Sequence, residues 1–165
     1  MIESERLVFV NYTEDDFSFL EKMLSNPNMV RYIGNGNVRN KNQSLEFFEW
    51  IIEHYNSNEN FGLKILKDKA TGQNIGHAGL VPQIVEGEKY IEVGYWIEED
   101  YWGNGYASEA AHILIKYGLY KLKLPKIIAL IQKGNSASEK VAIKNGMKKE
   151  KEILLKEKIV TIYTT

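Results

Sequence analysis

The sequence has no cysteine among its 165 residues. This absence excludes disulfides, metal sites built on thiolates, and catalysis through a cysteine acyl-enzyme. No apolar run approaches the length that crosses a bilayer, and residues 1–6 lack the basic and then apolar character of an export signal. We therefore expect a cytoplasmic protein without a membrane partner.

The sequence also lacks a strong net charge, since 21 Lys and Arg nearly balance 22 Asp and Glu. The balance is uneven along the chain: residues 1–100 contain 9 basic and 17 acidic side chains, whereas residues 101–165 contain 12 lysines and 5 glutamates. The acidic part would attract a cationic amine and the basic part an anionic cofactor, although solvated surface lysines explain the pattern equally well.

Two further classes of site find little support. The basic residues are not interleaved with aromatic residues in a recognised motif, so we do not expect nucleic acid as a partner. The three histidines, His54, His77 and His112, have no metal-like spacing, and the acidic run 98–100 has nothing nearby to complete a set of ligands. We therefore expect no metal, and single out His77 only because its strand could face a substrate.

The length fits a single domain over residues 1–165 with a sizeable core. Alternating apolar residues predict strands, and apolar residues at helical spacing predict helices. The expected strands are 6–11, 61–67, 74–81, 90–97, 126–131, 147–155 and 158–163; the expected helices begin near residues 13, 42, 105 and 135. This order places an antiparallel meander beside a parallel β-α-β step, which predicts an α/β fold with a mixed, mostly antiparallel sheet flanked by helices.

The most informative segment is a glycine-containing turn between an expected strand and an expected helix: Trp102, Gly103, Asn104, Gly105, Tyr106, Ala107 and Ser108. Its glycines let backbone amides approach a ligand closely, and the start of the following helix adds unpaired amides, so the segment suits a pyrophosphate. A Walker loop is excluded because Gly105 is not followed by Gly-Lys-Ser/Thr. A dinucleotide fingerprint is disfavoured because position 108 is serine and residues 123–133 contain no acid.

The turn resembles the acetyl-coenzyme A signature of the GCN5-related N-acetyltransferase (GNAT) superfamily, Gln/Arg-x-x-Gly-x-Gly/Ala. Trp102 takes the Gln/Arg place, while Gly105 and Ala107 match the last two positions. Trp-Gly-x-Gly-Tyr-Ala in this register, preceded by Gly-Tyr-Trp at 94–96, is similar to the RimJ/RimL branch. A second segment of the superfamily is matched by Asn135, Ser138, Val141, Gly146 and Met147.

The resemblance implies the GNAT (acyl-CoA N-acyltransferase) fold with splayed central strands and acetyl-CoA as co-substrate. It implies a bulge near Gly94 that separates two strands, with the pantetheine arm in the gap and bonded to backbone groups near Trp96 and Ile97. The pyrophosphate would lie on amides of Gly103, Asn104, Gly105, Tyr106 and Ala107, the Ser108 hydroxyl would add a bond, and Asn135 would reach the pantetheine. Trp102 belongs to the same expected cofactor site.

Acetyl transfer to an amine requires a base and a proton for the departing thiolate. Glu92 lies on the cofactor-facing strand among apolar neighbours that would raise its pKa, so it is the expected base; a strand-edge charge is the alternative. Many members of the superfamily have a tyrosine acid seven residues after the asparagine, but here that position is Ala142. Ser138 is the expected substitute, with helix capping as an equal alternative.

The expected activity is transfer of an acetyl group to a primary amine in a ternary complex. A peptide N-terminus is the first candidate acceptor, and a small polyamine or aminoglycoside-like molecule the second. The loop at 34–42 and the following helix would form the acceptor wall, with Tyr32, Phe47 and Trp50 either lining it or packing in the core. Ala142 leaves open a non-catalytic acyl-CoA-binding or sensing module. The chain could be a monomer or a homodimer.

Overall fold

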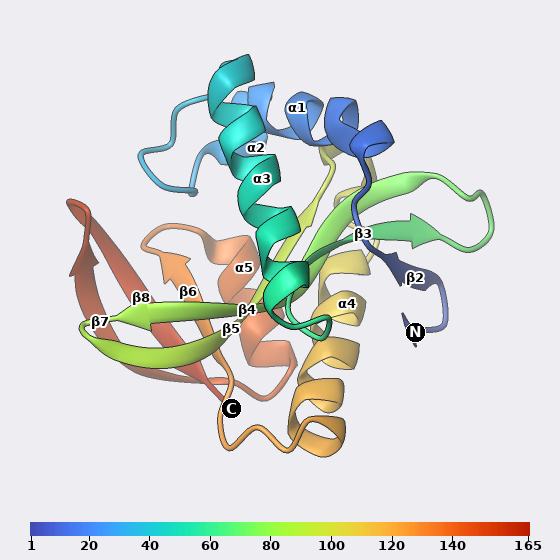
Figure 1. The fold of residues 1–165 in the computed structure, drawn as a ribbon. Coiled ribbons are helices and arrows are strands. Elements are labelled where there is room, and N and C mark those ends of the chain that lie inside the picture. Colours follow the sequence, from blue (N-terminus) through green and yellow to red (C-terminus); the bar gives the residue numbers. More distant parts are fainter.

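The structure is a computed structural model that describes all residues from 1 to 165. One eight-stranded sheet runs through it in the order β1-β2-β3-β4-β5-β6-β8-β7 (Figure 1). Only the β5–β6 pair is parallel, which confirms the predicted mixed, mostly antiparallel sheet. The strands are β1 (Ile2–Glu3), β2 (Leu7–Val10), β3 (Gly62–Asp68), β4 (Asn74–Val85), β5 (Glu88–Ile97), β6 (Ile128–Gln132), β7 (Lys148–Leu155) and β8 (Lys158–Thr164).

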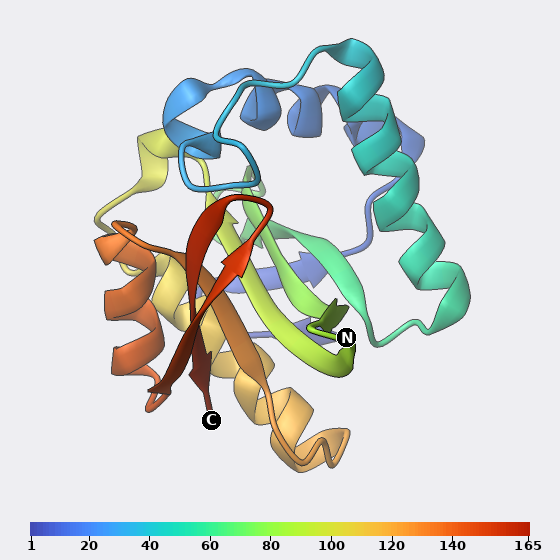
Figure 2. The ribbon, with the colours of Figure 1, turned by 90° about the vertical axis from the view of Figure 1, so that its left-hand side faces the viewer.

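Helices cover both faces of the sheet (Figures 1 and 2). One core packs α1, α2 and α3 against β3 and β4, and another packs α4 and α5 on the opposite face. The α-helices are α1 (Phe17–Ser25), α2 (Pro27–Val30), α3 (Lys41–Ser57), α4 (Tyr106–Lys116) and α5 (Ser136–Lys144); short 3-10 turns at Glu14–Asp16 and Glu99–Tyr101 and a π-helical turn at Tyr117–Lys121 complete the set. None of the helices is long and apolar enough to cross a membrane.

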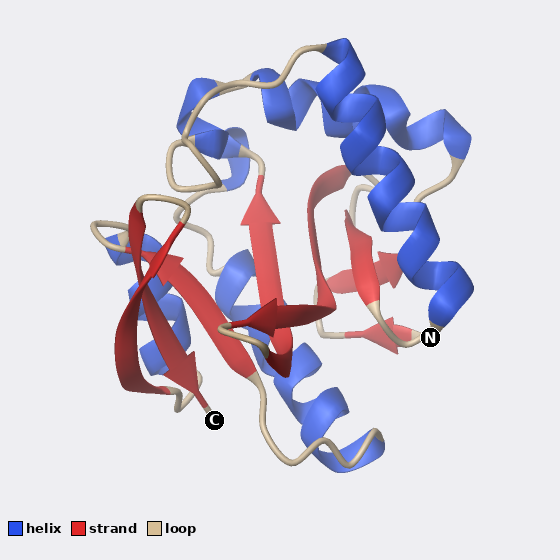
Figure 3. Cartoon of the chain, turned by 60° about the vertical axis from the view of Figure 1, so that its left-hand side comes forward, coloured by secondary structure: helices blue, strands red, loops and turns tan.

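The two central strands separate, as the resemblance to the GNAT superfamily implies. Strands β5 and β6 pair at a single position, Glu92 with Ile128, and then run apart toward their C-terminal ends (Figure 3). We call the region between residues 93–97 of β5 and 129–132 of β6 the wedge. In the sheet order nothing else pairs with these two facing edges, so the wedge exposes backbone groups that a regular sheet would use.

The cause of the separation differs from the expected bulge near Gly94. Strand β5 pairs with β4 over ten positions without a shift in register, and a methyl group placed on Gly94 would meet only Leu63, at 3.6 Å. The expectation of a bulge in this pairing is therefore wrong. Instead, β5 follows β4 along its whole length, while β6 pairs with β8 over five positions. The strands therefore diverge without a bulge in the β4–β5 pairing.

Candidate functional site

The glycine-containing turn carries six backbone amides without a partner. Gly103 and Gly105 adopt φ values of +77° and +79°, a left-handed conformation that side chains rarely tolerate. The turn therefore leads directly into α4, which has no side-chain cap, and no hydrogen bond uses the amides of residues 103–108 as donors. Together with the helix dipole, these free donors make an anion-binding site.

Arg6 holds this turn in place, and sequence reasoning missed it. Its Nε donates to Glu109 Oε2 at 2.7 Å, its amide donates to Glu109 Oε1 at 2.8 Å, and its Nη1 donates to the Asn104 carbonyl at 2.9 Å. The guanidinium also lies 4.2 Å from the centre of the Tyr106 ring. The contacts join residues about a hundred positions apart, so no local pattern indicates them.

The backbone of β5 decides which groups face the wedge. The Glu98 amide donates to the Ile75 carbonyl, and the bonds between antiparallel strands alternate along the chain. Trp96 therefore bonds toward β4, whereas Tyr95 and Ile97 direct their backbone groups into the wedge. The Ile97 carbonyl already accepts from Trp102 Nε1 at 2.6 Å. This geometry favours Tyr95 over Trp96 as a source of free backbone groups. Trp102 stabilises the end of β5 through its bond to Ile97.

Glu92 lies at the point where β5 and β6 separate. Its carboxyl is half-buried and accepts from Gln83 Nε2 at 2.7 Å, and the Leu130 amide of β6 also bonds to it. No cation forms an ion pair with it. Removal from water raises the pKa of Glu92 from 4.5 to about 7, and these two donors only partly offset that effect. The strand-edge alternative, an ordinary surface charge paired with a lysine, does not describe this environment.

The start of α5 brings the second expected site segment to the wedge. Asn135 is the N-cap of α5, and its Oδ1 accepts from the Ser138 amide at 3.3 Å, so capping is one of its tasks. The Ser138 carbonyl accepts from Tyr95 Oη at 3.0 Å, which links α5 to β5. The Ser138 side chain also hydrogen-bonds to Tyr95, which partly offsets the rise that burial causes in the pKa of Tyr95. Ser108 on α4 contacts the opposite end of α5, because Nδ2 of Asn145, the C-cap residue of α5, donates to its carbonyl and its hydroxyl at 3.2 and 3.3 Å.

Ala142 is buried in the core beneath α5, so its position offers no acid. His77 is also fully buried, and burial lowers its pKa to about 3, so it stays neutral near pH 7. Its Nδ1 lies 2.7 Å from Tyr12 Oη, while its Nε2 has no partner. The rings of Phe47 and Trp96 lie 6.4 and 4.5 Å from the His77 ring, and together they form an aromatic floor on the α3 side of the sheet.

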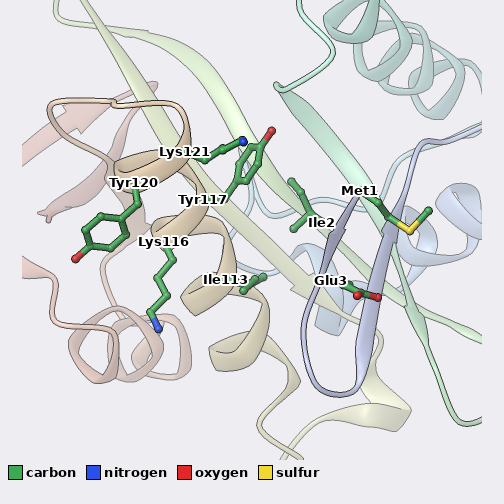
Figure 4. Close-up of a pocket in the computed structure, with 8 residues that line it drawn as sticks. All are labelled: Met1, Ile2, Glu3, Ile113, Lys116, Tyr117, Tyr120 and Lys121. Carbon is green, nitrogen blue, oxygen red and sulfur yellow. The ribbon is translucent and has the colours of Figure 1, made fainter.

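A separate cavity of about 320 Å³ lies at the other end of α4 (Figure 4). It is bounded by β1, by Ile113 and Lys116 of α4 and by the π-helical turn that follows. The glycine-containing turn precedes α4, whereas this cavity borders its C-terminal part. It is therefore not part of the site around the wedge. No group of three or more His, Cys, Asp or Glu side chains is placed to hold a metal ion.

Comparisons with known proteins agree with the expected fold. Residues 6–148 match the model of the acetyltransferase (GNAT) domain. The uncharacterized protein YkkB of Bacillus subtilis is 33% identical over 151 residues, which cover 90% of this chain and 85% of YkkB.

Two solved structures extend the comparison. A GNAT-family acetyltransferase from Bacillus anthracis superposes with a TM-score of 0.80 at 26% identity and covers 99% of this chain and 96% of its own. RimL, a ribosomal L7/L12 α-N-protein acetyltransferase in complex with coenzyme A, superposes with a TM-score of 0.79 at 15% identity. The superposition with RimL covers 98% of this chain and 94% of RimL. At 15% identity, the similarity to RimL shows only that the two proteins share a fold.

Proposed function

The chain belongs to the GNAT family and is an acetyl-CoA-dependent N-acetyltransferase; we propose that it acetylates a primary amine by direct attack, with Glu92 as the base and Ser138 as the acid. One observation carries this proposal. The Glu92 carboxyl lies where the two central strands separate, and its pKa of about 7 makes it a proton acceptor at neutral pH. Residues 1–165 would act as one acetyltransferase domain.

The free groups of the structure fit acetyl-CoA. The amides of residues 103–108 would hold its pyrophosphate, and the Ser108 hydroxyl would add a donor. The pantetheine arm would bond to the edges of the wedge at Tyr95 and Ile97, with the Asn135 amide nitrogen opposite. The co-substrate supplies the activated thioester that the amine attacks.

The protein residues would move two protons. Glu92 would accept one proton from the incoming ammonium, directly or through water, and so free the lone pair of the nitrogen. The C–N bond then forms and the C–S bond breaks, while a backbone amide of the wedge polarises the carbonyl oxygen. Ser138 would give a proton to the leaving thiolate and regain one from the acylated nitrogen by way of solvent. One amide, one thiol and one released proton balance the reaction.

The pKa of Glu92 influences which class of amine it can deprotonate. Proton transfer to a carboxyl of pKa about 7 is uphill by roughly 1.4 kcal/mol from an α-amine of pKa about 8. The same transfer from a lysine-type amine of pKa about 10.4 is uphill by roughly 4.6 kcal/mol. We therefore place an α-amine, as in a peptide N-terminus, ahead of a polyamine. RimL, which shares the fold, is named for an α-N-protein activity.

The test compares Glu92→Gln with Glu88→Gln. Glu88 is also on β5 but is exposed and bonds only to Tyr90 Oη. With a peptide acceptor and acetyl-CoA, Glu92→Gln should lower kcat by about 10²- to 10⁴-fold, because the base is lost. Acetyl-CoA affinity by calorimetry should stay unchanged, and Glu88→Gln should behave as the parent. Equal turnover of Glu92→Gln and the parent would remove Glu92 from this role.

A further inference from the structure

A cavity of about 670 Å³ lies on the α3 side of the sheet. It is open to solvent on one side and is lined by the loop at 34–39, by Gln43, Glu46 and Phe47 of α3, and by Lys156 at the β7–β8 turn. Figure 2 shows the loop before α3 next to this turn, although more than a hundred residues separate them in the sequence. The cavity is thus formed by three segments that only the fold brings together.

The walls of this cavity touch both strands of the wedge. On the β6 side, Gln132 Nε2 donates to the Gly34 carbonyl at 2.7 Å. On the β5 side, the Phe47 ring lies 5.6 Å from the ring of Trp96, which shares a face of β5 with Glu92. A molecule in the cavity would therefore lie near the C-terminal ends of both strands, on the face of β5 that carries Trp96 and Glu92.

The charges that line the cavity are mainly positive. Arg39 is half-buried with its guanidinium 5.5 Å from the centre of the Phe47 ring, and neither it nor Lys156 forms an ion pair. Gly34 makes room for the guanidinium, because a methyl group there would lie 3.2 Å from Arg39 Nη2. Glu46 is the single carboxylate of the lining. The acidic excess of residues 1–100 thus lies largely elsewhere.

We propose that the acceptor carries, besides its amine, an anionic group that Arg39 binds while the amine faces Glu92. This proposal rests on the proposed function. A half-buried guanidinium without a carboxylate partner favours a planar or tetrahedral oxyanion, a carboxylate or a phosphate, which it binds through two parallel hydrogen bonds. A polyamine would bring several ammonium groups next to two cations and one carboxylate, which like-charge repulsion disfavours.

The test uses acceptors that differ only in the anion. The dipeptide Ala-Ala and its C-terminal amide have α-amines of similar pKa, so their kcat/KM ratio reports the carboxylate. We expect kcat/KM of the parent to be about 10 to 100 times higher with Ala-Ala than with its amide, because this is the usual contribution of a hydrogen bond to a charged group. In Arg39→Gln the ratio should be near one. Arg31→Gln is the matched control, because Arg31 is exposed, lies over the Tyr32 ring and does not line the cavity. Phosphoethanolamine against ethanolamine tests phosphate in the same way, and spermidine tests the polycation.

The outcomes separate this proposal from the proposed function. A ratio near one for both pairs in the parent, or a preference for spermidine, overturns the anion proposal while acetyl transfer stands. No turnover of any amine overturns the proposed function, and calorimetry on the CoA-saturated protein then decides the anion proposal. The anion proposal is supported if Ala-Ala or phosphoethanolamine binds more tightly than its counterpart without the anion and if Arg39→Gln abolishes this difference. Equal binding within both pairs, or no binding of either anion-bearing amine, overturns the proposal.

Discussion

Replacing Glu92 by glutamine should stabilise the protein above pH 7 and leave its stability nearly unchanged at low pH. The reason is the partial burial of the carboxyl without a cation, which raises its pKa from 4.5 to about 7. Between these pH values the folded protein keeps the proton that the unfolded chain releases. The folded state then binds more protons, so the free energy of unfolding falls as the pH rises. Glutamine is uncharged and avoids this loss.

The size of the effect follows from the shift. A difference of 2.5 pKa units corresponds to at most roughly 3 kcal/mol above pH 7. Gln83 and the Leu130 amide both donate to the carboxyl, and the single oxygen of a glutamine serves them less well, at a cost of about 1 kcal/mol. The net gain at pH 8.5 is about 2 kcal/mol, or roughly 4–8 °C in Tm for a chain of this size.

Thermal unfolding followed by circular dichroism at pH 4 and pH 8.5 measures this difference. At pH 4 the carboxyl is protonated in the folded state and largely so in the unfolded chain, so the gain should vanish or turn into a small loss. Glu88→Gln, the exposed glutamate at the start of β5, should show no comparable dependence on pH. An equal difference in Tm between Glu92→Gln and the parent at both pH values would refute the reasoning about its burial.

Three other substitutions test the rest of the site. Gly103→Ala should weaken acetyl-CoA binding at least about tenfold by calorimetry, whereas Gly72→Ala, at a similar φ of +72° in the β3–β4 turn, should lose about 1 kcal/mol of stability only. Ser138→Ala should lower kcat by about 10²-fold with unchanged acetyl-CoA affinity. Tyr95→Phe leaves the Ser138 hydroxyl in place and should therefore lower kcat less. Arg6→Gln should weaken acetyl-CoA binding because the Asn104 carbonyl loses its anchor. Unchanged cofactor affinity in Gly103→Ala or Arg6→Gln, or unchanged kcat in Ser138→Ala, would contradict the corresponding assignment.

Features set by neighbouring residues could be predicted from the sequence. The turn before α4 follows from Gly103 and Gly105, because a left-handed conformation is a property of the residue itself. The strands and long helices follow from apolar periodicity in the same way. The helix expected to begin near residue 135 does so, because Asn135 is the N-cap of α5. The helix expected to begin near residue 105 starts at Tyr106 and changes to a π-helical turn after Lys116.

Features set by distant residues could not be predicted. The anchoring of the turn by Arg6 depends on Glu109, and the place of Arg39 depends on a cavity that the β7–β8 turn closes. The expected bulge at Gly94 was wrong for the same reason. A glycine permits a bulge, but the register of β5 is set by ten paired positions on β4, and nothing in the local sequence encodes them.

The separation of the two central strands links the proposed activity to stability. If β5 and β6 paired along their length, the edges at 93–97 would bond to β6 and no slot would remain for a cofactor. Where the strands part, burial raises the pKa of the Glu92 carboxyl, although Gln83 and the Leu130 amide partly offset this, and the raised pKa lowers the stability of the folded state above pH 7. The opening of the cofactor slot and the proposed base therefore lie at the same point of the sheet. A substitution that removes the buried charge of Glu92 should for that reason also remove the activity, and such a variant that gained stability at pH 8.5 without losing turnover would contradict this link.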